Sequence, residues 1–78
     1  MAVSPLFDAE KYTYRLLWSE EKSRYLGVCS EFPGLVYEAM NTVDALAGIQ
    51  KRVADELNDL EHNQKPAPKP LAALKFGL

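Results

Sequence analysis

The segment Glu31-Phe32-Pro33-Gly34-Leu35 constrains the fold of this chain most, because strand-like sequence precedes it and follows it. Pro33 cannot donate to a β-ladder and Gly34 tolerates a positive φ, so this pair predicts a tight turn. The turn predicts a strand over residues 24–30 before it and a strand over residues 35–40 after it. Gly27, inside the first of these, has no side chain to pack and predicts a bulge or a close backbone approach.

A further strand is expected over residues 10–18, where side chains alternate between two faces. Tyr12, Tyr14, Leu16 and Trp18 fall on one side, and aromatic residues at every second position are typical of a strand. Residues 19–23 are polar throughout and suit a hairpin loop. The chain therefore begins with three consecutive antiparallel strands.

One long helix is expected after the strands, ending near Asn63. Asn41 or Thr42 can accept a hydrogen bond from an amide of the first turn, and Asp44 suits the positive end of the helix dipole. Apolar side chains then recur every three or four residues, which places them on one stripe. They are Leu46, Ile49, Val53, Leu57 and Leu60.

After the helix, residues 66–70 contain three prolines and must be extended. Residues 71–78 are expected to supply one more short strand. We divide the chain into an irregular N-terminal segment (1–9), a core (10–64) and a proline-rich exit (65–78). The fold class is α+β, in the order β-β-β-α-β, with an antiparallel sheet of three to four strands and one long helix packed on one face.

The length of 78 residues allows one small domain. A chain of this size buries only about 60–65% of the surface that its unfolded form exposes. A thin core, unpaired strand edges and surplus aromatic side chains lead us to expect a homodimer or a higher homo-oligomer.

Charge and cysteine content exclude several classes of protein. The net charge of −2 argues against a strongly basic nucleic-acid footprint. Cys29 is the only cysteine, so an intrachain disulfide and a cysteine-based zinc site are excluded. No apolar run approaches the roughly 20 residues that cross a bilayer, and the first residues lack the pattern of a secretory signal. We expect a cytoplasmic protein without membrane association.

No catalytic set is indicated, and we expect a protein that is not an enzyme and has no cofactor or metal site. His62 lies at the expected helix end, where a cation favours the dipole. Cys29 lies in a predicted strand, where a free cysteine behaves as a small hydrophobe. Paired carboxylates elsewhere are expected to be solvated: Glu20 with Glu21, and Glu31 with Glu38.

Two binding surfaces remain as candidates. The second half of the helix is acidic, and Asp55, Glu56 and Asp59 are the candidate contacts for a basic protein partner, because complementary charge steers association. The alternative is an RNA-binding module in which sheet aromatics stack unpaired bases. Its candidate residues are Tyr12, Tyr14 and Tyr25.

Four segments of the chain together resemble the HicB family of antitoxins. They are Tyr12-Thr13-Tyr14-Arg15-Leu16-Leu17-Trp18, the run from Tyr25 through Pro33-Gly34-Leu35, Thr42-Val43-Asp44-Ala45-Leu46-Ala47-Gly48-Ile49, and Pro66-Ala67-Pro68-Lys69-Pro70-Leu71-Ala72. The resemblance covers residues 11 to about 76, and it rests on the order and spacing of the segments.

The resemblance implies a β-β-β-α-β domain similar to a degenerate RNase H core without its catalytic carboxylates. Members of the family belong to type II toxin–antitoxin systems and neutralise a small basic ribonuclease, the HicA toxin, by covering its active site. Many then repress their own operon through a C-terminal ribbon-helix-helix. This chain ends at Leu78, close to where that segment would begin, so we expect a truncated form for which direct DNA binding is not expected.

Overall fold

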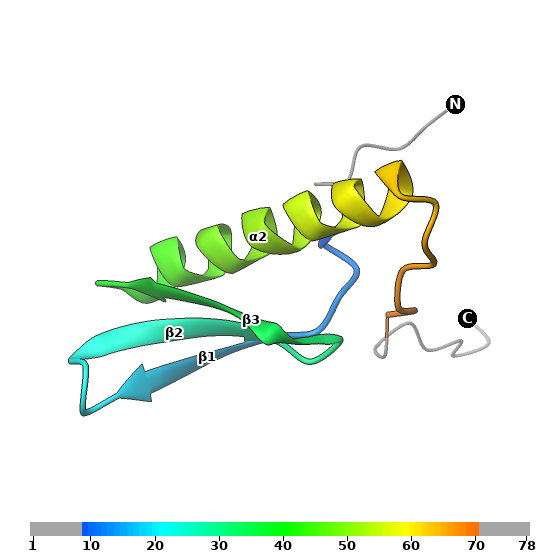
Figure 1. Cartoon of the computed structure of the whole chain (residues 1–78). Coiled ribbons are helices and arrows are strands. Elements are labelled where there is room, and N and C mark those ends of the chain that lie inside the picture. Colours follow the sequence, from blue (N-terminus) through cyan, green and yellow to red (C-terminus); the bar gives the residue numbers. More distant parts are fainter. Residues whose placement is uncertain (1–8, 71–78) are drawn as a thin grey trace.

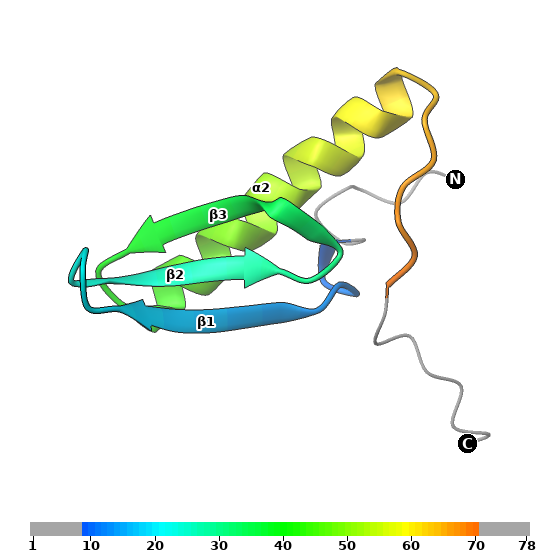
Figure 2. The same cartoon turned by 60° about the horizontal axis from the view of Figure 1, so that its bottom comes forward.

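Three strands form one antiparallel sheet in the order β1-β2-β3, and one helix crosses a single face of it (Figures 1 and 2). The structure is a computed structural model that describes residues 9–70. The elements are β1 (Tyr14–Ser19), β2 (Arg24–Cys29), β3 (Phe32–Ala39) and α2 (Thr42–His62). The α+β class and the order β-β-β-α are confirmed. The expected last strand within residues 71–78 lies outside the described residues, as do residues 1–8.

The first strand is shorter than the alternating pattern predicted. It begins at Tyr14 rather than Glu10, because the Tyr12 amide donates to the Ala9 carbonyl at 3.3 Å and closes a turn. Tyr12 is nevertheless buried, and Ala9 is fully buried beside it in the core. The alternation of side chains thus predicted the burial of Tyr12 correctly, although the hydrogen-bonded ladder of β1 begins only at Tyr14.

The prediction of a tight turn at Pro33-Gly34 is wrong. The chain reverses at Ser30 and Glu31, and β3 already begins at Phe32. Cys29 lies opposite Phe32 and Val28 lies opposite Val36, so residues 33–35 bulge out of the pairing with β2. A proline, which has no N–H to donate, fits such an unpaired stretch.

The helix approaches the sheet most closely at Gly27. A Cβ atom built on Gly27 would lie 2.5 Å from the Ala45 carbonyl oxygen and 2.9 Å from Ile49 Cγ2. The close backbone approach expected from this glycine is confirmed. Gly48 makes the reciprocal contact on the helix, since its Cβ would lie 2.1 Å from the ring of Tyr37 on β3.

The helix begins and ends where local signals indicate. Asn41 is the N-cap, and its side-chain oxygen accepts from the Asp44 amide at 2.8 Å. At the other end Gln64 has a φ of 57°, and the Lys65 amide donates to the Leu60 carbonyl at 2.8 Å. Between these ends, α2 presents its buried residues to the sheet: Ala45, Ile49, Val53, Ala54 and Leu57. No helix within residues 9–70 is both long enough and apolar enough to span a membrane.

The core lies between α2 and the sheet and extends to the start of β1. Ile49, Val53 and Cys29 are its largest fully buried side chains. The ring of Tyr12 packs edge to face on Phe32, with ring centroids 5.5 Å apart. The Tyr12 hydroxyl also donates to the Pro68 carbonyl at 2.5 Å, which ties the proline-rich exit to the core.

We predict that Gly27→Ala destabilises the protein by about 1–3 kcal/mol, the usual cost of an overpacked core. The added methyl would meet backbone at Ala45, which cannot move without shifting the helix. Urea unfolding followed by circular dichroism measures the loss. Gly34→Ala is the matched control, because nothing lies within 4 Å of its Cβ position. Equal stability of the two variants would contradict the helix contact.

Candidate functional site

The acidic half of α2 presents a solvent-facing surface. Asp55 and Asp59 are exposed and Glu56 is partly buried. Asp55 and Asp59 are four residues apart and therefore share one side of the helix. Lys51 lies 3.7 Å from the Asp55 carboxylate, but both side chains are well exposed, and such pairs hold little energy. This surface thus offers carboxylates that an incoming basic group can reach.

The three tyrosines considered for base stacking lie on the helix side of the sheet or in the core. Tyr12 is buried, and the Tyr14 hydroxyl donates to the Ala9 carbonyl. Tyr25 is partly buried and packs edge to face on Trp18, with centroids 5.0 Å apart. Ring faces already in contact with protein have little area left for a base, which argues against stacking by Tyr12 and Tyr14.

A carboxylate expected to be solvated, Glu31, ties β1 to the β2–β3 turn. Glu31 accepts hydrogen bonds from the Thr13 amide at 3.0 Å and from the Thr13 hydroxyl at 3.0 Å. The Cys29 thiol also donates to Glu31, at 3.4 Å. Thr13 lies 18 residues away from Glu31, so no local pattern in the sequence could have indicated this contact.

The Cys29 side chain is buried, as expected of a core residue. Burial is the main factor that raises the pKa of its thiol above the ordinary value. A raised pKa keeps the sulfur protonated near neutral pH, and the protonated form is a poor nucleophile. The geometry therefore favours the structural role for Cys29.

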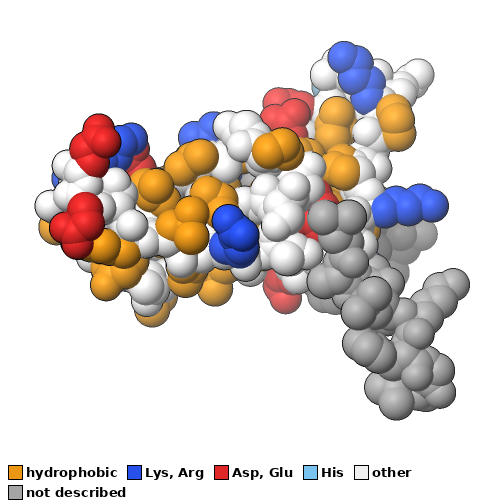
Figure 3. Space-filling model, turned by 90° about the horizontal axis from the view of Figure 1, so that it is seen from below, with side chains coloured by type: hydrophobic (Ala, Val, Ile, Leu, Met, Phe, Trp, Pro, Cys, Tyr) orange, Lys and Arg blue, Asp and Glu red, His pale blue; other side chains and the backbone are white. Residues whose placement is uncertain are grey.

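The second surface is the face of the sheet that α2 does not cover, which we name the open face. It carries the side chains that point away from Gly27 and the helix, and they form three cross-strand rows. The first row is Arg15, Val28 and Val36, the second is Leu17, Leu26 and Glu38, and the third is Ser19 and Arg24. Leu17 is 40% exposed and Val36 is 39% exposed. Figure 3 views the molecule from this side, where hydrophobic side chains gather over the strands and a basic side chain lies among them.

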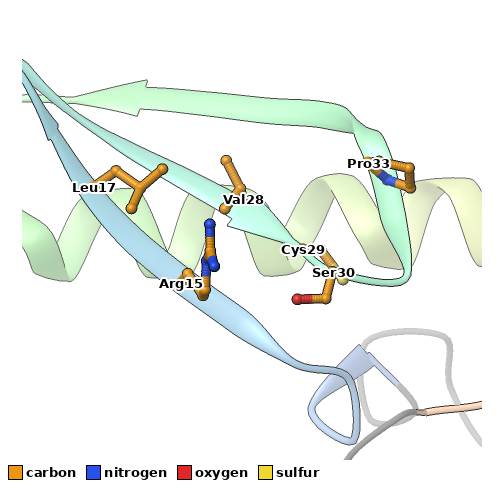
Figure 4. A pocket seen from close by; sticks show the side chains of 6 residues that line it. All are labelled: Arg15, Leu17, Val28, Cys29, Ser30 and Pro33. Atoms are coloured by element: carbon orange, nitrogen blue, oxygen red, sulfur yellow. The ribbon is translucent and has the colours of Figure 1, made fainter.

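A shallow hollow of about 350 Å³ opens on this face. Figure 4 shows the six residues that line it: Arg15, Leu17, Val28, Cys29, Ser30 and Pro33. Arg15 is exposed, and within residues 9–70 no carboxylate forms an ion pair with it. The hollow thus brings apolar side chains together with an available guanidinium group.

The carboxylate on the open face, Glu38, is already paired with a cation. The Lys22 ammonium donates to the Glu38 carboxylate at 2.6 Å. This hydrogen bond lowers the pKa of Glu38 and raises the pKa of Lys22 from their ordinary values. Both side chains are exposed, at 53% for Lys22 and 40% for Glu38, so the pair adds little to stability.

His62 lies in the last turn of α2 and is exposed. Among residues 9–70, no group of three or more His, Cys, Asp or Glu side chains is placed to hold a metal ion.

Comparison of the chain with models of known families, with curated proteins and with solved structures gave no match.

We predict that Glu31→Gln destabilises the protein by about 1–2 kcal/mol, because hydrogen bonds to a charged acceptor are replaced by weaker ones. The amide nitrogen of Gln cannot accept from Thr13. Glu21→Gln, in the exposed hairpin loop, removes the same charge and serves as the control. Urea unfolding at pH 7 compares the two variants. If Glu31→Gln lowers the free energy of unfolding no more than the control does, the hydrogen bonds between Glu31 and Thr13 contribute nothing to stability.

A second prediction concerns alkaline pH. Burial, helped by Cys29 and Glu31, raises the pKa of Tyr14 well above its usual value. The unfolded chain ionises Tyr14 near pH 10, whereas the folded chain keeps it neutral. This contribution to stability is therefore complete below about pH 10 and is lost as the pH rises above that value.

The measurement is the free energy of unfolding between pH 8 and about pH 11, spanning the ordinary tyrosine pKa. In Tyr14→Phe, the free energy of unfolding should fall less steeply with rising pH than in the parent protein. At pH 8 this variant should be less stable than the parent, because the hydrogen bond to the Ala9 carbonyl is lost. Tyr37→Phe, whose ring is 39% exposed, is the control and should keep the parent's slope. If the free energy of unfolding of Tyr14→Phe falls with pH as steeply as that of the parent, Tyr14 is not the group that causes the loss of stability at alkaline pH.

Proposed function

We propose that this chain is a HicB-like antitoxin module, a non-enzymatic protein that binds a small basic ribonuclease of the HicA type and covers its active site. The observation that carries the proposal is the acidic, solvent-facing surface of α2, formed by Asp55, Asp59 and the partly buried Glu56. The order β-β-β-α and the four segments that resemble the family support it.

The proposed mechanism is steric and electrostatic. Carboxylates on the second half of α2 attract a basic partner from a distance, and attraction of this kind raises the association rate. Once the partner is bound, the rigid helix and sheet block access of RNA to its active site. The basic residues of α2, Lys51 and Arg52, lie one to two turns earlier, so they set one boundary of the acidic surface.

The RNase H-like character of the scaffold belongs to the same proposal. A three-stranded antiparallel sheet with a helix across one face is compatible with a degenerate core of that type. Binding to the toxin requires no catalytic group from this chain, and the partner's active site supplies the surface to be covered.

We predict that the triple charge reversal Asp55→Lys, Glu56→Lys and Asp59→Lys weakens binding to a HicA-type toxin by at least about tenfold, because like charges at an interface cost several kcal/mol. The partner for this test is a small basic HicA-type ribonuclease, and calorimetric titration measures the affinity. The affinity of the parent protein should also fall with added salt, since screening shortens the attraction to about 10 Å at 0.1 M.

The control carries the same change of charge elsewhere: Glu10→Lys, Glu20→Lys and Glu21→Lys, all at exposed positions outside α2. If both triple variants bind alike, only the net charge matters and the contact surface is wrong. If the parent protein does not bind the toxin at all, the proposed function fails.

A further inference from the structure

We propose that the hollow on the open face is a binding site for a small monocarboxylic acid with an apolar body, whose carboxylate pairs with Arg15. The inference goes beyond the proposed function, because it uses side chains of β1, β2 and the β2–β3 turn and none of the acidic residues of α2. It stands or falls independently of any toxin.

The size and the lining of the hollow suit a small ligand. Its volume of about 350 Å³ is at the lower end of the range of about 300–1,000 Å³ that is typical of small-molecule sites. Leu17, Val28 and Pro33 supply apolar contact, and Arg15 and Ser30 supply polar groups (Figure 4). Small-molecule sites commonly combine a mainly apolar lining with a few polar groups that orient the ligand.

The polar groups of the hollow determine the sign of the charge that it accepts. Arg15 and Ser30 are exposed, and within residues 9–70 neither side chain forms an ion pair or a hydrogen bond. A guanidinium group presents several N–H donors in one plane, so it can hold a carboxylate through two parallel hydrogen bonds. The Ser30 hydroxyl can donate one more. An ammonium group in the same place would meet a like charge.

The surroundings of the hollow favour one negative charge over several. Arg24, the next cation on the open face, lies at the far end of β2, beside the hairpin loop that carries Glu20 and Glu21. The Glu38 carboxylate also lies on this face. A polyanion such as a nucleic-acid strand needs several cations along its backbone, and here it would meet carboxylates instead. A ligand with a single carboxylate at Arg15 avoids them.

The apolar body of the ligand has a surface to lie on. From the hollow, Leu26 and Val36 continue the apolar surface across the neighbouring strands. No strand or helix within residues 9–70 covers this surface, since α2 lies on the other side of the sheet (Figure 1). Burial of apolar area is favourable in proportion to the area removed from water. The charge and the apolar body should therefore both contribute to affinity.

The experiment is a titration of the isotope-labelled full chain with hexanoate at neutral pH, followed by the NMR shifts of the backbone amides. Binding should be saturable, with the largest shifts at Leu17, Val28 and Ser30. Acetate, which lacks the apolar chain, and hexanol, which lacks the charge, should each bind about three- to tenfold more weakly than hexanoate.

Two substitutions separate the charge from the apolar contact. Arg15→Gln should weaken hexanoate binding by about three- to tenfold, the effect of one ion pair at an exposed site, and should leave hexanol binding unchanged. Leu17→Asn should weaken the binding of both ligands. Leu17 is 40% exposed, so this substitution leaves the core intact, and the amide spectrum of each variant checks its fold.

Arg24→Gln is the matched control, because it makes the same substitution on the same face but outside the hollow. It should bind hexanoate as the parent protein does. If Arg24→Gln weakens binding as much as Arg15→Gln, only the net charge matters and the site is wrong.

Other results would also overturn the proposal. They are the absence of saturable shifts with hexanoate, shifts confined to α2, and hexanol that binds the parent protein as tightly as hexanoate does. A second copy of the chain on the open face would move the same amides when the protein alone is diluted. It would leave hexanoate no site to occupy.

Discussion

The contact between α2 and Gly27 of β2 is the constraint on which the rest of the structure depends. The Ala45 carbonyl and Ile49 lie where a side chain at position 27 would be, so the helix backbone rests directly on the sheet. Only this short separation lets Ile49 and Val53 become fully buried in so small a domain. Small domains fold with a net stability of about 5–15 kcal/mol or less. Displacement of the helix from the sheet by the width of one side chain would therefore remove much of the net stability of the domain.

The contact between α2 and Gly27 also determines which face of the sheet is covered and which is exposed. One face of the sheet is occupied by α2, and the open face carries its apolar rows toward solvent. The side of α2 turned away from the sheet presents the carboxylates of Asp55 and Asp59. The acidic side of α2 and the open face therefore lie on opposite sides of the molecule. Both surfaces are on regular elements, which hold their side chains in fixed relative positions.

Sequence patterns located most of the elements because their causes are local. Alternation placed Leu16 and Trp18 on the same side of β1, and Asn41 marked the start of α2 through a hydrogen bond three residues away. The pattern failed where the cause was distant. Pro33 and Gly34 looked like a turn, yet the tie between Glu31 and Thr13 fixes the reversal earlier and leaves the proline in a bulge. Stacking by Tyr12 was a reasonable expectation until its ring proved to be packed on Phe32.

The sequence by itself determined the order β-β-β-α, the span of the helix and the acidic character of the second half of the helix. These features depend on side-chain periods and on contacts a few residues apart. The tertiary structure alone decided that Glu31 binds Thr13, that Tyr12 reaches Pro68, and that Arg15 lies in one row with Val28 and Val36 on the open face. Those relations join residues that are far apart in the chain. They exist only once the register of the strands is set, because the register decides which residues become neighbours across the sheet.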